Sequence, residues 1–382
     1  MMGLLRRVAA VLGLTALCWT TGCAGFWVAV GNSGGSTTTP TNDYVYVANA
    51  TTETVSGFAV GTGTLTSVTG TSYSLGFPPT AVAVNPADSI LFVGSNTAIY
   101  AFAINSSTGA LSVLNGGGAV GYAYVASMDI SPDGNWLFAL DQNNTTLDEF
   151  QINPSTGVLT AYTPIAYPVP SGATAVAHGV KFAPSGNYLF LALGTAGDVV
   201  YTFDTALTSG ALTTPLSLSL GSASTNSDNA LAVSPDSTLL FIARSGPGGG
   251  LAAYTIGSGG SLAQVSGSPF SAGALPFSVA VNAAGTDVYV ANRTDGTISG
   301  FSIASSSGVL TALSVSPYQS GSAVTALAVD NSGDYLLAAA NGGSPDLTMY
   351  SYDPTIAGKL DFSTSIATGT DPTGPVALAT TH

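Results

Sequence analysis

Short apolar segments separated by turns rich in Gly, Ser, Thr and Asn recur along most of this chain, and no helical period follows the first 23 residues. Within Asp287–Leu313, an apolar strand, a turn, a strand ending in Phe301 and Ile303, a turn at Gly308 and a further strand follow one another. Alternating apolar and polar positions, rich in β-branched and aromatic residues, are typical of half-buried strands. This stretch therefore predicts three consecutive strands.

The same pattern recurs seven times along the chain. Each copy begins with an apolar strand that ends at or near a polar residue: Tyr44–Asn49, Ser89–Gly94, Trp136–Asp141, Tyr188–Leu193, Leu239–Arg244, Asp287–Asn292 and Tyr335–Ala340. The next strand of each copy carries an aromatic residue near its end: Phe58, Phe102, Phe150, Phe203, Tyr254, Phe301 and Tyr352. A Gly-x-Leu turn then opens a third strand: Gly63, Gly109, Gly157, Gly210, Gly260, Gly308 and Gly358. A strand rich in Ala and Val precedes the next copy, as at Ala81–Val84 and Ala230–Val233.

Four antiparallel strands repeated at intervals of about 45 to 52 residues are the signature of a β-propeller rather than a sandwich. We therefore predict an all-β fold over residues 43–382, a seven-bladed β-propeller of four-stranded blades whose Ala/Val strands line the axis. The first copy has no Ala/Val strand before Tyr44, whereas Pro375–Ala379 is such a strand without a following copy. We expect this C-terminal strand to complete the first blade and close the ring, which removes an exposed sheet edge.

The first 23 residues have the architecture of an export signal. Arg6 and Arg7 precede an apolar run, Val8–Trp19, that is shorter than the roughly 20 residues a membrane-spanning helix needs. The run is followed by Gly22-Cys23, which predicts a lipoprotein-type signal peptide with an acylated Cys23. An ordinary signal peptide cut nearby is the alternative.

Residues 24–42, rich in Gly, Ser and Thr, are expected to be a tether between the lipid anchor and the propeller. We therefore expect an exported lipoprotein of the cell envelope, either periplasmic or at the surface, that reaches the membrane through its N-terminal lipid. Both cysteines, Cys18 and Cys23, lie at the leader, so the fold would be held without a disulfide.

The charge of the chain restricts its partners. Only 7% of its 382 residues are charged, six are Lys or Arg, and the net charge is −14. No basic surface of the kind that binds phosphate backbones can be assembled, so we expect no nucleic-acid partner. A monomer without a cofactor is predicted.

Residues suited to catalysis are scarce. His178 and His382 are the two histidines, which leaves little for a metal site or a Ser-His-Asp triad, and no metal is predicted. The acidic cluster Asp141, Asp148 and Glu149 is interpreted as a solvated turn rather than a catalytic carboxylate pair.

The longest loops are expected on the face where the inner strands begin, called the top face below, so a ligand is expected there. Five aromatic residues lie in or near its blade-to-blade loops: Tyr122, Tyr124, Tyr167, Phe270 and Tyr318. They could stack on sugar rings, but the favoured interpretation is that they fill the gaps between blades.

Two segments carry a resemblance to a known family: His178–Pro184, which reads His-Gly-Val-Lys-Phe-Ala-Pro, and Asn292–Phe301, which begins Asn-Arg and ends Ile-Ser-Gly-Phe. With the Tyr-Val-Ala-Asn repeats, they resemble the seven-bladed β-propeller lactonases, also called 6-phosphogluconolactonase-like, and the YVTN-repeat propellers. The resemblance implies that His178 and Arg293 are catalytic residues on the top face, the first as a base and the second as the cation that stabilises the oxyanion.

The chain departs from the lactonases at three positions. Ser227–Ala230 stands where they have Gly-Pro-Arg-His, Arg244-Ser245 where they have Asn-Glu, and Ala192 where they have Asp. These departures favour an extracytoplasmic binding or interaction scaffold that takes an unknown protein or carbohydrate ligand on its top face. The alternative is a lactonase, a carboxylic ester hydrolase that opens a small lactone ring.

Overall fold

The computed structural model describes residues 43–204, 212, 216–218, 225–343, 345–369, 372, 374 and 377–382. The predictions for the signal peptide, Cys23 and the tether lie outside these residues, as do those for Pro375 and Val376. No helix in the described part of the chain is long and apolar enough to cross a membrane.

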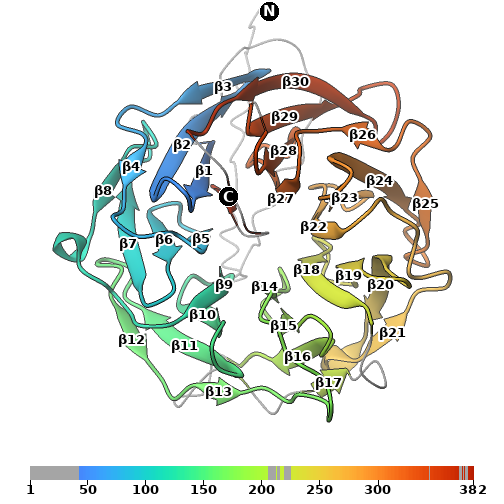
Figure 1. Cartoon of the computed structure of the whole chain (residues 1–382), viewed down its shortest axis with the longest axis horizontal. Helices are drawn as coiled ribbons and strands as arrows, with labels where there is room; N and C mark the ends of the chain where they lie inside the picture. The colour runs from blue at the N-terminus through green and yellow to red at the C-terminus, as the bar shows by residue number, and fades with distance from the viewer. Residues whose placement is uncertain are drawn as a thin grey trace, which may run out of the picture. The chain divides into compact units, whose positions relative to one another are not determined.

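The described strands form seven antiparallel sheets around one axis, and this arrangement confirms the predicted seven-bladed propeller (Figure 1). From the axis outward, blade 1 consists of β31 (Leu378–Thr380), β1 (Tyr44–Asn49), β2 (Thr54–Gly61) and β3 (Thr64–Ser67). Blade 2 consists of β5 (Ala81–Val84), β6 (Ile90–Gly94), β7 (Ile99–Ile104) and β8 (Leu111–Val113). Blade 3 consists of β9 (Val125–Ile130), β10 (Trp136–Asp141), β11 (Thr146–Ile152) and β12 (Leu159–Ala161).

Blades 4 to 7 run β14 (Gly179–Phe182), β15 (Tyr188–Ala192), β16 (Asp198–Thr202) and β17 (Leu216–Leu218); β18 (Ser227–Val233), β19 (Leu239–Ser245), β20 (Gly250–Ile256) and β21 (Leu262–Gln264); β22 (Pro276–Val281), β23 (Asp287–Asn292), β24 (Thr297–Ile303) and β25 (Leu310–Ala312); β27 (Val324–Val329), β28 (Tyr335–Ala340), β29 (Leu347–Tyr352) and β30 (Leu360–Ile366). Three short strands, β4 (Tyr73–Ser74), β13 (Ile165–Ala166) and β26 (Tyr318–Gln319), extend blades 1, 3 and 6.

The repeated Gly-x-Leu turn has a conformational reason. All six of its described glycines have a φ between 66° and 77°, which is the left-handed region where a side chain would be strained. In two of these turns, a tyrosine of the neighbouring blade donates a hydrogen bond to the carbonyl oxygen of the glycine. Tyr46 of β1 donates its hydroxyl hydrogen to the carbonyl oxygen of Gly109 at 2.8 Å, and Tyr289 of β23 does the same to Gly358 at 2.7 Å. The repeat motif thus fastens each of these blades to its neighbour.

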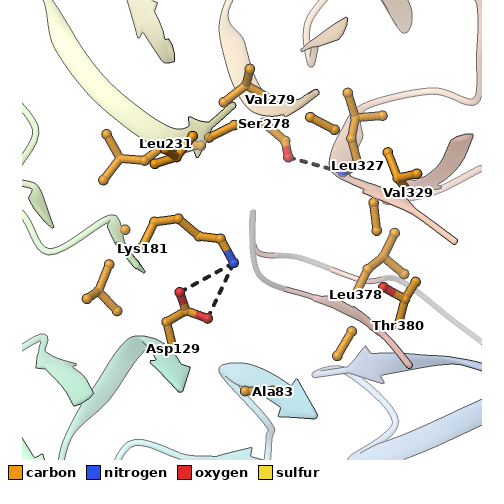
Figure 2. A pocket seen from close by; sticks show the side chains of 18 of the residues that line it. Ala83, Asp129, Lys181, Leu231, Ser278, Val279, Leu327, Val329, Leu378 and Thr380 are labelled. Carbon is orange, nitrogen blue, oxygen red and sulfur yellow. Dashed lines mark hydrogen bonds and ion pairs between the residues drawn. The ribbon is translucent and has the colours of Figure 1, made fainter. Parts of the chain in front are cut away.

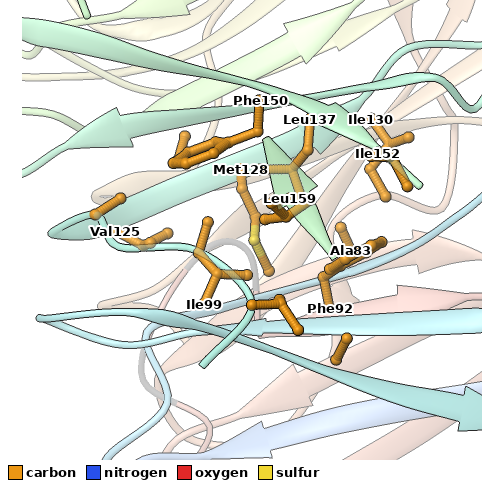
Figure 3. Packing of buried hydrophobic residues seen from close by; sticks show 14 of the residues in the cluster. Ala83, Phe92, Ile99, Val125, Met128, Ile130, Leu137, Phe150, Ile152 and Leu159 are labelled. Atoms are coloured by element: carbon orange, nitrogen blue, oxygen red, sulfur yellow. The ribbon is translucent and has the colours of Figure 1, made fainter. Parts of the chain in front are cut away.

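The core is divided among the blade interfaces, with one cluster of buried apolar side chains at each of the seven described interfaces. Figure 3 shows the cluster between blades 2 and 3, where Phe92 and Ile99 of one sheet pack against Met128, Leu137 and Phe150 of the next. Burying side chains of this size contributes roughly 1.5–3 kcal/mol each before entropy is counted. Burial between faces of neighbouring sheets therefore holds the ring together.

The C-terminal strand closes the ring, as predicted. β31 pairs antiparallel with β1, placing Leu378 opposite Val47 and Thr380 opposite Val45. The backbone N–H of Ala48 donates to Ala377 at 2.9 Å, which continues the ladder beyond the strand. The inner strand of blade 1 thus comes from the opposite end of the sequence from the three strands it completes.

A buried carboxyl group at the ring closure predicts a pH-dependent stability. Asp43, just before β1, lies against the turn between β27 and β28 and accepts the backbone N–H groups of Asn331 and Ser332, both at 3.4 Å. Burial, together with a hydrogen bond to Asp330 and the charge of that residue, raises the pKa of Asp43 to about 8. A carboxyl group with a raised folded-state pKa stabilises the fold fully below its ordinary pKa of 3.8, and this contribution is lost progressively as the pH rises from there to about 8.

Asp43→Asn should therefore melt at least about 3 °C above the wild type at pH 9, where the buried carboxylate is ionised, and the difference should be smaller at pH 5. Thermal unfolding followed by circular dichroism at both pH values checks this. An equal difference at the two pH values would contradict the assignment.

Candidate functional site

The axis of the propeller contains a cavity of about 320 Å³ that is lined by the inner strands of all seven blades. Most of its lining is aliphatic, as Figure 2 shows for Leu231, Val279, Leu327 and Leu378. The wall follows from the Ala/Val pattern of the inner strands, because small side chains leave open space where seven strands converge. The few polar side chains in this wall therefore decide what it can bind.

One ion pair projects into the axial cavity (Figure 2). The Lys181 ammonium lies 3.3 Å from the Asp129 carboxylate, and the two residues come from the neighbouring inner strands β14 and β9. Asp129 also accepts the backbone N–H of Phe182 at 2.8 Å, which fixes the carboxylate. Nearly half of the Lys181 side chain remains exposed, so its ammonium group can contact a small molecule in the cavity.

His178 lies where the chain enters β14, at the top end of the same cavity. Its backbone N–H donates to the carbonyl oxygen of Ala192 at 3.1 Å, which ties the residue to the adjacent strand β15. Burial lowers the pKa of His178 below 6.5, and the negative charge of Asp228 opposes this effect only in part. The imidazole is therefore neutral at pH 7, the form in which it can accept a proton.

A buried group of charged side chains lies at the top of the interface between blades 4 and 5. We call it the blade 4–5 ion cluster: Asp198, Asp228, Arg244 and Tyr254. Arg244 donates to both carboxylate oxygens of Asp228, with Nη2 3.0 Å from Oδ2, and its Nη1 lies 3.4 Å from the Tyr254 hydroxyl. This bidentate pair spans adjacent strands, because Asp228 of β18 is opposite Arg244 of β19.

The second carboxyl group of the ion cluster belongs to blade 4. Asp198 of β16 approaches Arg244 Nη2 at 3.7 Å, and both side chains are buried. Burial and the neighbouring charge of Asp228 raise the pKa of Asp198 well above its usual range. Arg244 thus pairs with Asp228, whose charge also acts on His178, and the raised pKa of Asp198 favours its protonated form.

Arg293 lies over an aromatic ring of blade 6. Its guanidinium carbon lies 4.6 Å from the ring centroid of Phe277, a cation–π contact, and its backbone N–H donates to Leu275 at 3.0 Å. His178 lines the cavity, whereas Arg293 is not among the described lining residues. The two residues taken from the family motifs therefore belong to different blades, 4 and 6, and make different contacts.

The rest of the Asn292–Phe301 motif also has structural contacts. The Asn292 side chain donates to Thr297 at 3.0 Å and to Ser299 at 2.9 Å, and so joins β23 to β24. Asp295 accepts the backbone N–H of Ala274 at 2.6 Å. This motif therefore stabilises a hairpin and its neighbouring loop.

The interpretation of Asp141, Asp148 and Glu149 as a solvated turn is wrong, because all three side chains are buried. Asp141 accepts the backbone N–H groups of Asn143 and Asn144 at 2.6 and 2.8 Å, so it holds the turn from inside. Burial and the charge of Asp141 raise the pKa of Asp148 to about 6. A turn-rich sequence gives no sign of this burial.

The five aromatic residues of the top-face loops divide into two groups. Tyr167 and Tyr318 are buried and Phe270 packs against the core, as expected of residues that fill gaps between blades. Tyr122 and Tyr124 are exposed, to 80% and 43%. The gap-filling interpretation therefore does not describe these two.

Sequence inspection did not single out Lys181 with Asp129, or Asp228 with Arg244, as pairs. The sequence did contain a signal for these residues. Lys181 lies within the His178–Pro184 motif, and Asp228 and Arg244 lie at positions where the chain departs from the lactonases. Among the described residues, no group of three or more His, Cys, Asp or Glu side chains could hold a metal ion.

Comparisons with known proteins agree with this architecture. A family model described as "Lactonase, 7-bladed beta-propeller" matches residues 195–310 and 247–377. A putative 6-phosphogluconolactonase of Bacteroides uniformis superposes with a TM-score of 0.71 at 16% identity, covering 89% of this chain and 99% of its own. A putative 6-phosphogluconolactonase of Bacteroides fragilis superposes with a TM-score of 0.71 at 17% identity, covering 90% of this chain and 99% of its own.

A periplasmic gluconolactonase of Pseudomonas aeruginosa superposes with a TM-score of 0.66 at 16% identity, covering 89% of this chain and 99% of its own. No curated protein matches the chain. At these identities the solved structures show the fold alone.

The fold and the axial cavity define a closed seven-bladed propeller with a small-molecule-sized chamber on its axis. Over residues 195–377 the chain matches the model of the seven-bladed β-propeller lactonases, the family that its sequence motifs resemble.

Proposed function

We propose that this protein is a lactonase-type hydrolase that opens a small ring ester at the top of the axial cavity. The observation that carries the proposal is His178, a neutral imidazole at the wall of a cavity of about 320 Å³, with the charge of Asp228 near it. The match to the lactonase model supports the same chemistry. The scaffold function favoured by the sequence becomes the second candidate.

The reaction needs a base for water and a positive charge for the oxyanion. The His178 imidazole takes a proton from a water molecule while the water oxygen bonds to the lactone carbonyl carbon. The tetrahedral intermediate then breaks its bond to the ring oxygen, and the imidazolium returns its proton to that oxygen. The products are a free hydroxyl group and a carboxylic acid, which loses its proton to solvent.

The Asp228 carboxylate stabilises the transient imidazolium, and its bidentate contact with Arg244 keeps it in place. Lys181, three residues beyond His178 on the cavity wall, is the cation that we assign to the oxyanion or to the product carboxylate. Arg293 is assigned to substrate contact or to loop stability at the top face, since it lies over Phe277.

The charges of the axial cavity favour an uncharged substrate. Asp129 neutralises the Lys181 ammonium, and the aliphatic wall adds no further cation. A phosphorylated lactone would bring about two negative charges into a site with one paired cation. We therefore propose a neutral lactone.

The second candidate is a binding scaffold, and the position of Arg293 favours it. If catalysis requires both motif residues at one carbonyl group, the location of Arg293 outside the cavity lining argues for ligand binding without turnover. Hydrolysis of simple γ- and δ-lactones by purified protein, followed by pH-stat above the buffer rate, separates the two candidates. Turnover supports the hydrolase, and its absence at millimolar lactone supports the scaffold.

We propose further that the protein is exported and anchored in the cell envelope by a lipid on Cys23. Support comes from Gly22-Cys23 after the apolar run and from the fold shared with a periplasmic gluconolactonase. Labelled palmitate should enter the wild type, and Cys23→Ser should abolish the labelling and leave the protein soluble or unprocessed. Cys18→Ser is the matched control and should leave the labelling intact. Membrane association that survives in Cys23→Ser would contradict the anchor.

A further inference from the structure

Tyr122 and Tyr124 form an aromatic surface on the top face, which we call the tyrosine platform. From Gly121 to Val125 buried and exposed positions alternate: Ala123 and Val125 are buried in the core between blades 2 and 3, whereas the two tyrosines are exposed. Alternation in an extended segment places residues i and i+2 on the same side, about 6.6 Å apart along the chain. The two rings are therefore presented to solvent together.

The backbone of the platform is fixed on both sides. Ile99 of blade 2 donates to the carbonyl oxygen of Gly121 at 2.9 Å, and Val125 donates to Ser95 at 3.0 Å. On the blade 3 side, Gln142 donates to the carbonyl oxygen of Tyr124 at 2.8 Å. The rings thus project from a braced segment, which lowers the entropy cost of binding a ligand.

The surroundings of the platform are polar but uncharged. The platform is bordered on the blade 3 side by Gln142, Asn143 and Asn144, and on the blade 2 side by Asn96 and Thr97. All five residues are exposed. Asp141 is buried beneath the turn and accepts the backbone N–H groups of Asn143 and Asn144. A ligand therefore meets two aromatic rings framed by amide and hydroxyl groups.

We infer that the tyrosine platform is a binding site for a neutral glycan, separate from the axial cavity. The C–H groups on one face of a sugar ring pack against the electron-rich face of an aromatic ring. The sugar hydroxyls bond to amides, which both donate and accept hydrogen bonds. A nucleic acid or a phosphorylated ligand would need cations that these described residues lack. Two rings at positions i and i+2 of one extended segment can contact neighbouring units of a glycan chain.

The test is affinity electrophoresis of the purified full chain in native gels containing xyloglucan, galactomannan, laminarin or dextran. The wild type should be retarded by at least one of these neutral polysaccharides. Tyr122→Ala and Tyr124→Ala should each weaken the retardation on the order of tenfold, as expected for the loss of one aromatic contact. Tyr122→Trp, which keeps an aromatic face, should retain it.

Phe362→Ala is the matched control, because Phe362 is 66% exposed on the outer strand β30. It should migrate like the wild type in every gel. The proposal of a glycan site at the tyrosine platform is overturned if none of the four polysaccharides retards the wild type. It is also overturned if the double variant, which carries both Tyr122→Ala and Tyr124→Ala, is retarded as strongly as the wild type. Lactone hydrolysis should be unchanged in the tyrosine variants, so a failed platform and a failed hydrolase give different results.

Discussion

Deletion of Pro375–His382 is expected to lower the melting temperature of the propeller by on the order of 10 °C. The deletion removes β31, the inner strand of blade 1, together with the burial of Leu378 and the bonds between β31 and β1. One large aliphatic side chain and a short ladder contribute on the order of 5 kcal/mol in all. The remaining ring would also expose the edge of β1, so aggregation should increase. Thermal unfolding and light scattering measure both effects.

Deletion of His382 alone is the control. It removes the contacts of His382 with Asp88, at 2.8 Å from the backbone N–H and 3.0 Å from the imidazole, but leaves β31 paired with β1. This variant should melt close to the wild type. A synthetic peptide of residues 375–382 added to the larger deletion should restore part of the lost stability by donating the strand. An unchanged melting temperature in the larger deletion would contradict the closure.

His178→Ala is expected to reduce lactone hydrolysis on the order of 10² or more, because the substitution removes the base that activates water. Since burial lowers the pKa of His178 below 6.5, the neutral base is present above that pKa and is lost as the pH falls through it. Wild-type kcat/KM should thus be level near pH 7–8 and decline only at a pH lower than the ordinary histidine pKa of 6.5. The decline should be absent from the residual activity of His178→Ala.

His382→Ala is the matched control for this prediction. His382 lines the same cavity but pairs with Asp88 in an exposed position, so its removal should leave the rate and the pH profile unchanged. Equal rate losses in both histidine variants would indicate a structural effect, and turnover that survives in a folded His178→Ala would remove His178 from the mechanism. Arg293→Ala should change KM or stability more than kcat, given its contact with Phe277.

Most of the fold was predictable because each blade repeats local signals. The Gly-x-Leu turn requires a left-handed φ, as at Gly308 with 69°, and glycine is the residue that adopts it without strain. β1, β10 and β23 have the predicted bounds, since a strand that begins after a turn and ends at a polar residue is delimited by its own sequence. The position of the C-terminal strand was also predictable, because blade 1 was the one repeat without an inner strand of its own.

The candidate site was predictable only in part. His178 could be located from its motif and the start of an inner strand. Its surroundings could not, because Asp228 and Arg244 are 16 residues apart and Asp198 comes from another blade. Whether they bond depends on the registers of β18, β19 and β16 across an interface. The position of Arg293 in its motif likewise did not predict the cation–π contact between its guanidinium group and the ring of Phe277.

The sequence by itself determined the blade number, the strand order and the closure of the ring, because period, turn chemistry and strand alternation are properties of neighbouring residues. The tertiary structure alone decided which polar groups are buried and paired. Asp148 became buried, Lys181 came to face Asp129 across the axis wall, and Tyr122 stayed in solvent. The physical reason is that the burial and charge of a side chain depend on the blade beside it, which lies about 50 residues away along the chain.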